Sequence, residues 1–132
     1  LHDDVTLQHF SYQANNGTEL FMHFSDKHHL FAMLRLRLPN ETSKAGQLFP
    51  ILTKTALIRE LQVFGQQVGI SKARSTHASQ HQSLGQQLVK KAEIISKEKG
   101  YKTIAIISGI GVRGYYEKLG YKLQDTYMAK KL

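Results

Sequence analysis

The hydrophobic pattern changes its period once along this chain, and that change limits the folds available to it. Before residue 65, apolar and polar side chains alternate, most clearly at residues 30–38, as in a strand with one buried face. A long polar connection follows at residues 65–80. Apolar residues then recur at helical spacing: Leu84, Leu88, Ala92 and Ile95. The sequence therefore predicts strands in its first half and one amphipathic helix after them.

Three further strands are predicted in the first half of the chain. They are expected at residues 5–12, 19–24 and 56–64, where β-branched, aromatic and other apolar residues stand between breakers. A turn is expected between the first two, at Asn16 and Gly17. The first half thus supplies a run of strands with short connections, which is typical of antiparallel pairing.

The part that follows the helix contains another strand–helix–strand series. Gly100 is expected to end the long helix. Residues 103–108 are a continuous apolar run, typical of a strand covered on both faces. A short helix at 112–119 and a final strand at 121–130 complete the order. Antiparallel strands that lead into such a unit imply an α+β fold with a mixed sheet, in one domain over residues 1–132.

Composition excludes several classes of protein. The chain has 132 residues, 41% hydrophobic and 21% charged, as in an ordinary soluble domain. It has no cysteine, which excludes a disulfide framework and a cysteine-bound cluster within it and is compatible with the cytoplasm. No apolar run approaches the roughly 18 residues of a membrane span. The seven histidines form no ligand set with a carboxylate, so no metal site is expected.

Positive charge gathers in the second half of the chain. Residues 66–132 carry twelve basic and four acidic side chains, against six of each before them, so the net charge of +8 lies there. A basic field attracts polyanions such as nucleic acid, an anionic membrane or a phosphorylated cofactor. A solvated face would give the same charge. The first residue is Leu1 rather than Met, which is compatible with a C-terminal piece of a longer protein.

The first candidate site is expected where the polar connection ends and the long helix begins. Residues 80–85 read Q-H-Q-S-L-G. The first N–H groups of a helix lack internal partners and favour an anion, and small residues let the backbone approach a phosphate. The segment is therefore either a pyrophosphate cradle or an ordinary helix start with Ser83 near its cap.

The second candidate site combines a glycine-rich turn with two adjacent tyrosines. Gly109, Gly111 and Gly114 follow the apolar run, and the short helix carries Tyr115 and Tyr116. A strand that ends in such a turn can present side chains to a ligand. The alternative is an ordinary turn, with one tyrosine in the core and the other exposed to solvent.

Together, the two motifs resemble those of the GNAT acyltransferases. Residues 80–85 are similar to the family's acetyl-CoA motif Q/R-x-x-G-x-G/A, and residues 116–121 to its segment Y-E-K-x-G-F/Y. A longer series, in the same order and within residues 17–132, resembles the C-terminal acetyltransferase domain of the Elongator catalytic subunit. Its clearest members are residues 59–65, 80–82, 92–93, 107–113 and 115–116.

The resemblance implies a GNAT fold, a mixed and mostly antiparallel sheet flanked by helices, and an acetyl-CoA-dependent acyltransferase. It implies that β-strand residues beside the pantetheine arm contact the cofactor: Glu60, Leu61, Gln62 and Val63. The pyrophosphate would lie on the backbone of a second group: Gln82, Ser83, Leu84, Gly85, Gln86 and Gln87. Tyr116 would stabilise or protonate the departing thiolate, and Tyr115 would shape the substrate pocket.

Three positions depart from the Elongator-type pattern. Ser83 replaces the first glycine of the cradle, and Gln62 and Phe64 stand where the pattern has histidine and tyrosine. Gln62 cannot act as a general base, which leaves Glu60 as the nearest carboxylate. Glu60 either faces the site or pairs with an arginine, Arg59 or Arg35, on the sheet surface.

The resemblance leaves the acceptor of the acetyl group open. Elongator-type enzymes modify the wobble uridine of tRNA, with a preceding radical-SAM domain whose iron–sulfur cluster this cysteine-free chain could not hold. A protein lysine or a small amine is the alternative acceptor, although the charge of +8 disfavours a cationic amine. A third possibility is an inactive GNAT-fold module that binds RNA through its basic second half. The oligomeric state is left open.

Overall fold

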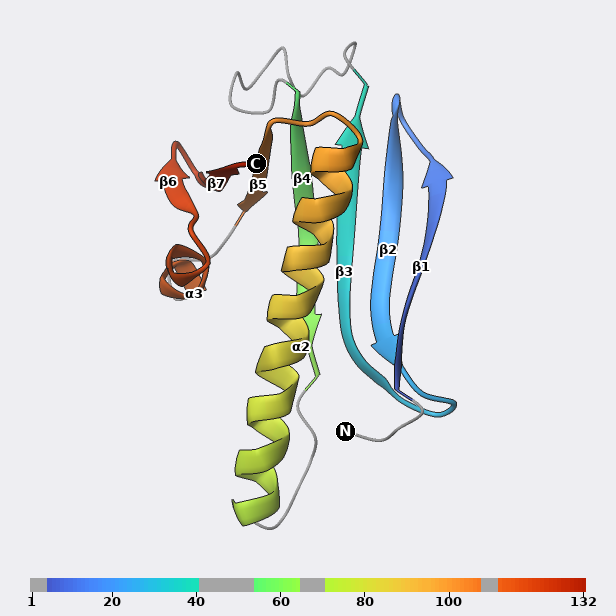
Figure 1. Cartoon of the computed structure of the whole chain (residues 1–132), viewed down its shortest axis with the longest axis vertical. Helices are drawn as coiled ribbons and strands as arrows, with labels where there is room; N and C mark the ends of the chain where they lie inside the picture. Colours follow the sequence, from blue (N-terminus) through green and yellow to red (C-terminus); the bar gives the residue numbers. More distant parts are fainter. Residues whose placement is uncertain (1–4, 41–53, 65–70, 108–111) are drawn as a thin grey trace.

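The computed structural model describes the backbone of residues 5–40, 54–64, 71–107 and 112–132, and the side chains of these residues apart from 71–82. Figure 1 shows the arrangement of the elements. In chain order, the described elements are β1 (Thr6–Gln13), β2 (Gly17–Ser25), β3 (Leu30–Pro39), β4 (Thr55–Val63), α2 (Ser71–Glu98), β5 (Thr103–Ile107), α3 (Arg113–Lys118), β6 (Lys122–Gln124) and β7 (Tyr127–Lys131).

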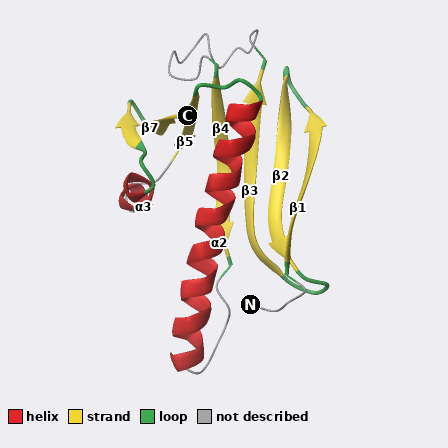
Figure 2. Cartoon of the chain, viewed as in Figure 1, coloured by secondary structure: helices red, strands yellow, loops and turns green. Residues whose placement is uncertain are grey.

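The described strands form one sheet in the order β1-β2-β3-β4-β5-β7-β6. Among them, β4 and β5 pair in parallel, and the other neighbours pair antiparallel. Parallel neighbours need a crossover connection, and α2 supplies it. Figure 2 shows α2 lying along β3 and β4 on one face of the sheet. The predicted mixed, mostly antiparallel sheet is confirmed.

The alternating pattern of β2 and β3 buries one face of the sheet under α2. Leu34, Leu36 and Leu38 of β3 are buried, while Arg35 between them is exposed, as predicted. The β1–β2 turn has positive φ at Asn15 and Asn16, and Gly17 is already the first residue of β2. Two left-handed residues in a two-residue hairpin match the right-handed twist of the strands. The predicted turn is therefore present, one residue earlier than expected.

The predicted apolar stripe of the long helix is confirmed. Its four residues are all buried in the core against the sheet: Leu84, Leu88, Ala92 and Ile95. The helix ends at Glu98, and Gly100 follows it with a φ of 94°, in the left-handed region that glycine adopts without strain. The N–H groups of Gly100 and Tyr101 donate to the carbonyls of Lys97 and Ser96, at 3.1 and 3.0 Å.

Two predicted boundaries are wrong. The long helix begins at Ser71 rather than at about residue 83. Residues 71–81 contain no Gly or Pro, so their serine and glutamine side chains do not prevent helix propagation. The final strand is also two strands, β6 and β7, joined by a turn in which Asp125 has a φ of 52°. Aspartate tolerates this conformation better than most residues do.

A partly buried polar cluster ties α2 to the last strand. The Tyr121 hydroxyl donates to Glu93 Oε2 at 2.9 Å, and Lys130 Nζ lies 3.2 Å from Glu93 Oε1. Lys130 Nζ also donates to the carbonyl of Leu119 at 2.9 Å. Burial, and then the charge of Glu93, raise the pKa of Tyr121 well above its ordinary value. The phenol therefore stays a hydrogen-bond donor to Glu93.

Within the described residues, no helix has the length and apolar character of a membrane span.

Candidate functional site

The candidate site lies where β4 and β5 separate. Thr55–Ile58 of β4 pair with Thr103–Ile106 of β5, and the described pairing stops there. Beyond that point β4 continues along β3 alone, up to Val63. The divergence opens a cavity of about 390 Å³ between β4, the end of β5 and α3. The residues that line it are Arg59, Glu60, Leu61, Gln62, Val63, Ile106, Ile107, Val112, Tyr115 and Tyr116.

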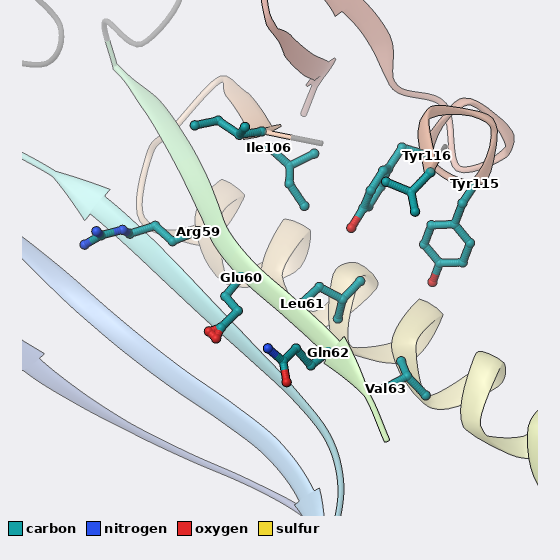
Figure 3. A pocket seen from close by; sticks show the side chains of 10 residues that line it. Arg59, Glu60, Leu61, Gln62, Val63, Ile106, Tyr115 and Tyr116 are labelled. Carbon is teal, nitrogen blue, oxygen red and sulfur yellow. The ribbon is translucent and has the colours of Figure 1, made fainter. Parts of the chain in front are cut away.

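A β-bulge in β4 decides which side chains face which side of the sheet. Leu36 pairs with Ile58, but Arg35 pairs with Glu60, so Arg59 is an extra residue. Before the bulge, Ile58 lies in the core under α2, and after it Leu61 packs there. Bulges re-aim side chains in this way. Figure 3 shows the result, with Glu60 and Gln62 on one side of β4 and Leu61 and Val63 on the side of the tyrosines.

The short helix α3 brings both predicted tyrosines to the cavity. Their rings meet edge to face with centroids 5.0 Å apart, and Tyr116 packs in the same way on Tyr121 at 5.9 Å. Tyr116 is buried and Tyr115 half-buried, and both line the cavity, so the alternative of an ordinary turn with one ring exposed to solvent does not hold. Burial, and secondarily Tyr115, raise the pKa of Tyr116 to about 12, and burial raises that of Tyr115.

Glu60 is a cavity carboxylate rather than a partner of an arginine. Arg59 Nη1 lies 3.2 Å from Glu19 Oε1, and Arg37 Nη1 lies 3.1 Å from Glu19 Oε2. Glu19 is only 5% exposed and holds both guanidinium groups. Arg35 stands opposite Glu60 in the register, but no ion pair joins Glu60 to a described residue. Glu60 is therefore the one carboxylate among the described residues that line the cavity.

The predicted pyrophosphate segment lies inside α2, and this corrects the expected mechanism. Residues 82–87 stand eleven or more residues from the helix start at Ser71, so their N–H groups bond to carbonyls four residues back. They are not the free groups of a first helical turn. Ser83, Gln86 and Gln87 are exposed, with Gln87 Nε2 donating to Ser83 Oγ at 3.2 Å, while Leu84 is in the core. Contact of this segment with a cofactor stays a prediction.

Gly85 lies in close contact with two side chains of the cavity wall. A Cβ added there would lie 2.9 Å from Val63 Cγ2 and 3.1 Å from the Tyr115 hydroxyl oxygen. Contacts this short need a neighbour to move. The absence of a side chain lets α2 approach both β4 and α3 at the edge of the cavity, so Gly85 connects the two predicted motifs.

Sequence reasoning missed part of the cavity wall and its supporting carboxylate. Ile106, Ile107 and Val112 line the cavity, and Ile107 is 64% exposed at the end of a buried strand. The sequence shows Ile107 only as one residue of a continuous apolar run, so its exposure could not be predicted. Glu19 was missed because a single acidic residue in an alternating strand is usually solvated. Among the described residues, no group of three or more His, Asp or Glu side chains could hold a metal.

Comparison with known proteins gives relatives over nearly the whole chain. No family model matches. The chain is 41% identical to the tRNA uridine(34) acetyltransferase of Methanocaldococcus infernus, over 98% of this chain and 24% of that protein. It is 40% identical to Elongator complex protein 3 of Saccharomyces cerevisiae, with the same coverage. The chain therefore spans about a quarter of the length of the curated relatives it matches.

Solved structures give the same relationship and the fold. The structure of the archaeal Methanocaldococcus infernus Elp3 matches with a TM-score of 0.79 and 40% identity, over 98% of this chain and 30% of that one. This chain is a GNAT-fold domain related to the Elongator complex protein 3 family. A Bacillus subtilis acetyltransferase solved in complex with CoA shares the fold, with a TM-score of 0.53 and 15% identity over 96% of this chain and 99% of that one.

Membership of this fold gives the divergence of β4 and β5 a chemical meaning. The amide groups of β4 that face the cavity have no described strand partner. Amide groups at an open strand edge bond to water, and an extended ligand that itself carries amides can take the place of that water. The apolar side chains of Leu61, Ile106 and Val112 fit the methylene part of such a ligand. The pantetheine arm of acetyl-CoA has this chemistry, so the β4 half of the predicted site fits it.

Proposed function

We propose that this domain binds acetyl-CoA between β4 and β5 and supports transfer of its acetyl group. The observation that carries the proposal is the cavity at the strand divergence, with Leu61, Gln62 and Val63 on one wall and Tyr116 on the other. The β4 backbone would pair with the pantetheine amides. Positioning of the thioester is the main contribution of such a site to the rate.

Tyr116 would stabilise the sulfur that leaves. In a polar acyl transfer, the acceptor bonds to the carbonyl carbon, the carbon–sulfur bond breaks and sulfur carries away the electron pair. A thiol titrates near 8.5, so full transfer of the proton from a phenol with a pKa of about 12 is uphill by roughly 5 kcal/mol. Tyr116 therefore donates a hydrogen bond to the thiolate rather than its proton. The Glu60 carboxylate lines the cavity but points to the side of β4 away from the tyrosines (Figure 3), so it accepts the proton only of an acceptor that enters from that side.

We propose that the domain binds and opens acetyl-CoA for the modification of a tRNA uridine. The support is the activity for which relatives about 40% identical to this chain are named, tRNA uridine(34) acetyltransferase. The net charge of +8 also favours a polyanion over a cationic amine. A protein lysine is the alternative acceptor. A tRNA acceptor fits the cytoplasmic location that the cysteine-free composition led us to expect.

The first test is isothermal titration of the domain with acetyl-CoA. We expect the wild type to bind acetyl-CoA in the micromolar range and Tyr116→Phe to bind it about as tightly. In the presence of tRNA, Tyr116→Phe should release CoA roughly 10- to 100-fold more slowly than the wild type. Tyr115→Phe is the matched control, because it removes a phenol oxygen from the neighbouring ring. An equal loss of rate in both variants would contradict the role given to Tyr116.

The Ser83→Gly variant tests the predicted pyrophosphate segment separately. If it tightens acetyl-CoA binding, residues 82–87 contact the cofactor and the helix must open there on binding. No effect would mean that the segment acts only in packing. Absence of binding in both the wild type and Ser83→Gly would refute the acetyl-CoA proposal and favour an inactive module that binds RNA.

A further inference from the structure

Two hollows lie at the end of the molecule away from the β4–β5 cavity. The larger, of about 570 Å³, separates β1 and β2 from the last turns of α2. The smaller, of about 420 Å³, lies between the end of β3, the start of β4 and the α2–β5 turn. Asn40, Lys99 and Tyr101 line both hollows. The two hollows therefore adjoin, and we call them together the lysine groove.

The lysine groove carries a strong excess of positive charge. Lys91 and Lys99 line the larger hollow, and Lys54, Lys99 and Lys102 the smaller one. Glu98 is the carboxylate among the described residues that line it, so even with Lys54 set aside three lysines, Lys91, Lys99 and Lys102, face one acid. The negative end of the α2 dipole opposes an anion here by about 0.3–1 kcal/mol, and its carbonyls of Ser96 and Lys97 are already bonded. The lysines outweigh this effect.

Neutral hydrogen-bonding side chains face the lysines across the groove. Ser11, Gln13 and Thr18 come from β1 and β2, and Asn40 follows β3. Gln13 Nε2 donates to Thr18 Oγ1 at 2.9 Å, which orders the two side chains. Lysines together with hydroxyl and amide groups are the usual contacts of proteins to phosphate oxygens. The chemistry of the groove thus fits a phosphodiester chain better than an isolated carboxylate.

The groove and the cavity lie at opposite ends of the same strand. Lys54 directly precedes β4, whereas Glu60–Val63, at the other end of β4, line the cavity. At about 3.3 Å per residue, six to nine residues separate the two sites by roughly 20–30 Å. A single nucleotide cannot reach both sites, but a folded RNA can.

We propose that the lysine groove binds the phosphodiester backbone of the RNA whose acceptor nucleotide enters the β4–β5 cavity. The acceptor part of this inference rests on the proposed function. The groove itself stands on its own lining residues, and its binding to RNA is measured without acetyl-CoA.

The test compares two double variants that remove the same charge. Lys99→Ala with Lys102→Ala alters the groove, and Lys118→Ala with Lys122→Ala removes two exposed lysines from α3 and β6. Fluorescence anisotropy of a labelled tRNA transcript is measured over a series of KCl concentrations. We expect the groove variant to bind about tenfold more weakly and to lower the slope of log K against log salt by about 1.5, with at most a small change in the control.

Several outcomes decide the proposal. Equal weakening by both double variants would mean that only net charge matters, and would overturn it. Displacement of the RNA by poly-glutamate at the same charge concentration would also overturn it, because the groove would then not select phosphodiesters. Acetyl-CoA titration of the groove variant should match the wild type, since the cavity is remote. If neither protein binds acetyl-CoA but the RNA result holds, the proposed function fails and the groove stands.

Discussion

At the residue scale, Gly85 shows that one residue type can satisfy two different requirements. The sequence suggested a small residue so that a phosphate could approach the backbone. In the structure, the absence of a side chain at Gly85 leaves room for Val63 and the Tyr115 hydroxyl, both on the cavity wall. The packing requirement holds whether or not a phosphate binds nearby.

We expect Gly85→Ala to lower the free energy of unfolding by about 1–2 kcal/mol. Overpacking costs about 1–3 kcal/mol, and the better helix propensity of alanine returns up to about 1 kcal/mol. Urea unfolding measures the change. Gly114→Ala in α3 is the matched control, because a Cβ there meets no atom within 4 Å. Val63→Ala removes the atom closest to the added Cβ. The double variant Gly85→Ala with Val63→Ala should therefore lose less free energy of unfolding than the sum of the two single losses. Strict additivity would rule out the clash as the cause.

At the element scale, α2 is held to the C-terminal hairpin by the cluster of Glu93, Tyr121 and Lys130. The side chains of Glu93 and Lys130 are 17% and 31% exposed, so water screens their charges only partly. Removing the Glu93 carboxylate leaves the buried Tyr121 hydroxyl without its acceptor, while Lys130 keeps the carbonyl of Leu119. The cluster therefore fixes the helix relative to the strand that pairs with β5.

We expect Glu93→Ala to lower the free energy of unfolding by roughly 1–3 kcal/mol, because the Tyr121 hydroxyl and Lys130 lose their shared acceptor. Glu98→Ala removes an exposed carboxylate from the same helix and should change stability by less than about 0.5 kcal/mol. Thermal unfolding of the two variants side by side measures both. Similar melting temperatures for Glu93→Ala and the wild type would contradict the role of the cluster.

The elements could be predicted where periodicity alone determines them. The alternation of β3 and the stripe at Leu84 and Leu88 follow directly from burial of one face. The bulge at Arg59 could not be predicted, because no Gly or Pro marks it and it depends on the register with β3. The start of α2 at Ser71 was missed because its serines and glutamines read as a loop. Resemblance to a family located the β4 residues and the tyrosines that the cavity brings together, but it did not place residues 82–87.

At the scale of the whole molecule, one strand links two surfaces of different chemistry. The start of β4 borders the lysine groove, and its end forms the wall of the apolar cavity. The paired part of β4 lies between them, hydrogen-bonded to both β3 and β5. A ligand at one end of β4 therefore contacts the same strand as a ligand at the other end. This chain carries both surfaces although it spans only about a quarter of the length of the related proteins.

The separation of β4 from β5 also gives this sheet an internal edge. Amide protons at an outer edge exchange quickly with solvent, and those of Arg59–Val63 that face the cavity should do the same in the free domain. Acetyl-CoA at about 100 times its Kd would slow their exchange up to about 100-fold if it occupies the missing strand position. Hydrogen exchange followed by NMR measures each amide, with the outer edge of β1 as the internal reference. Slowing confined to these amides would show that the cofactor completes the sheet as an additional strand.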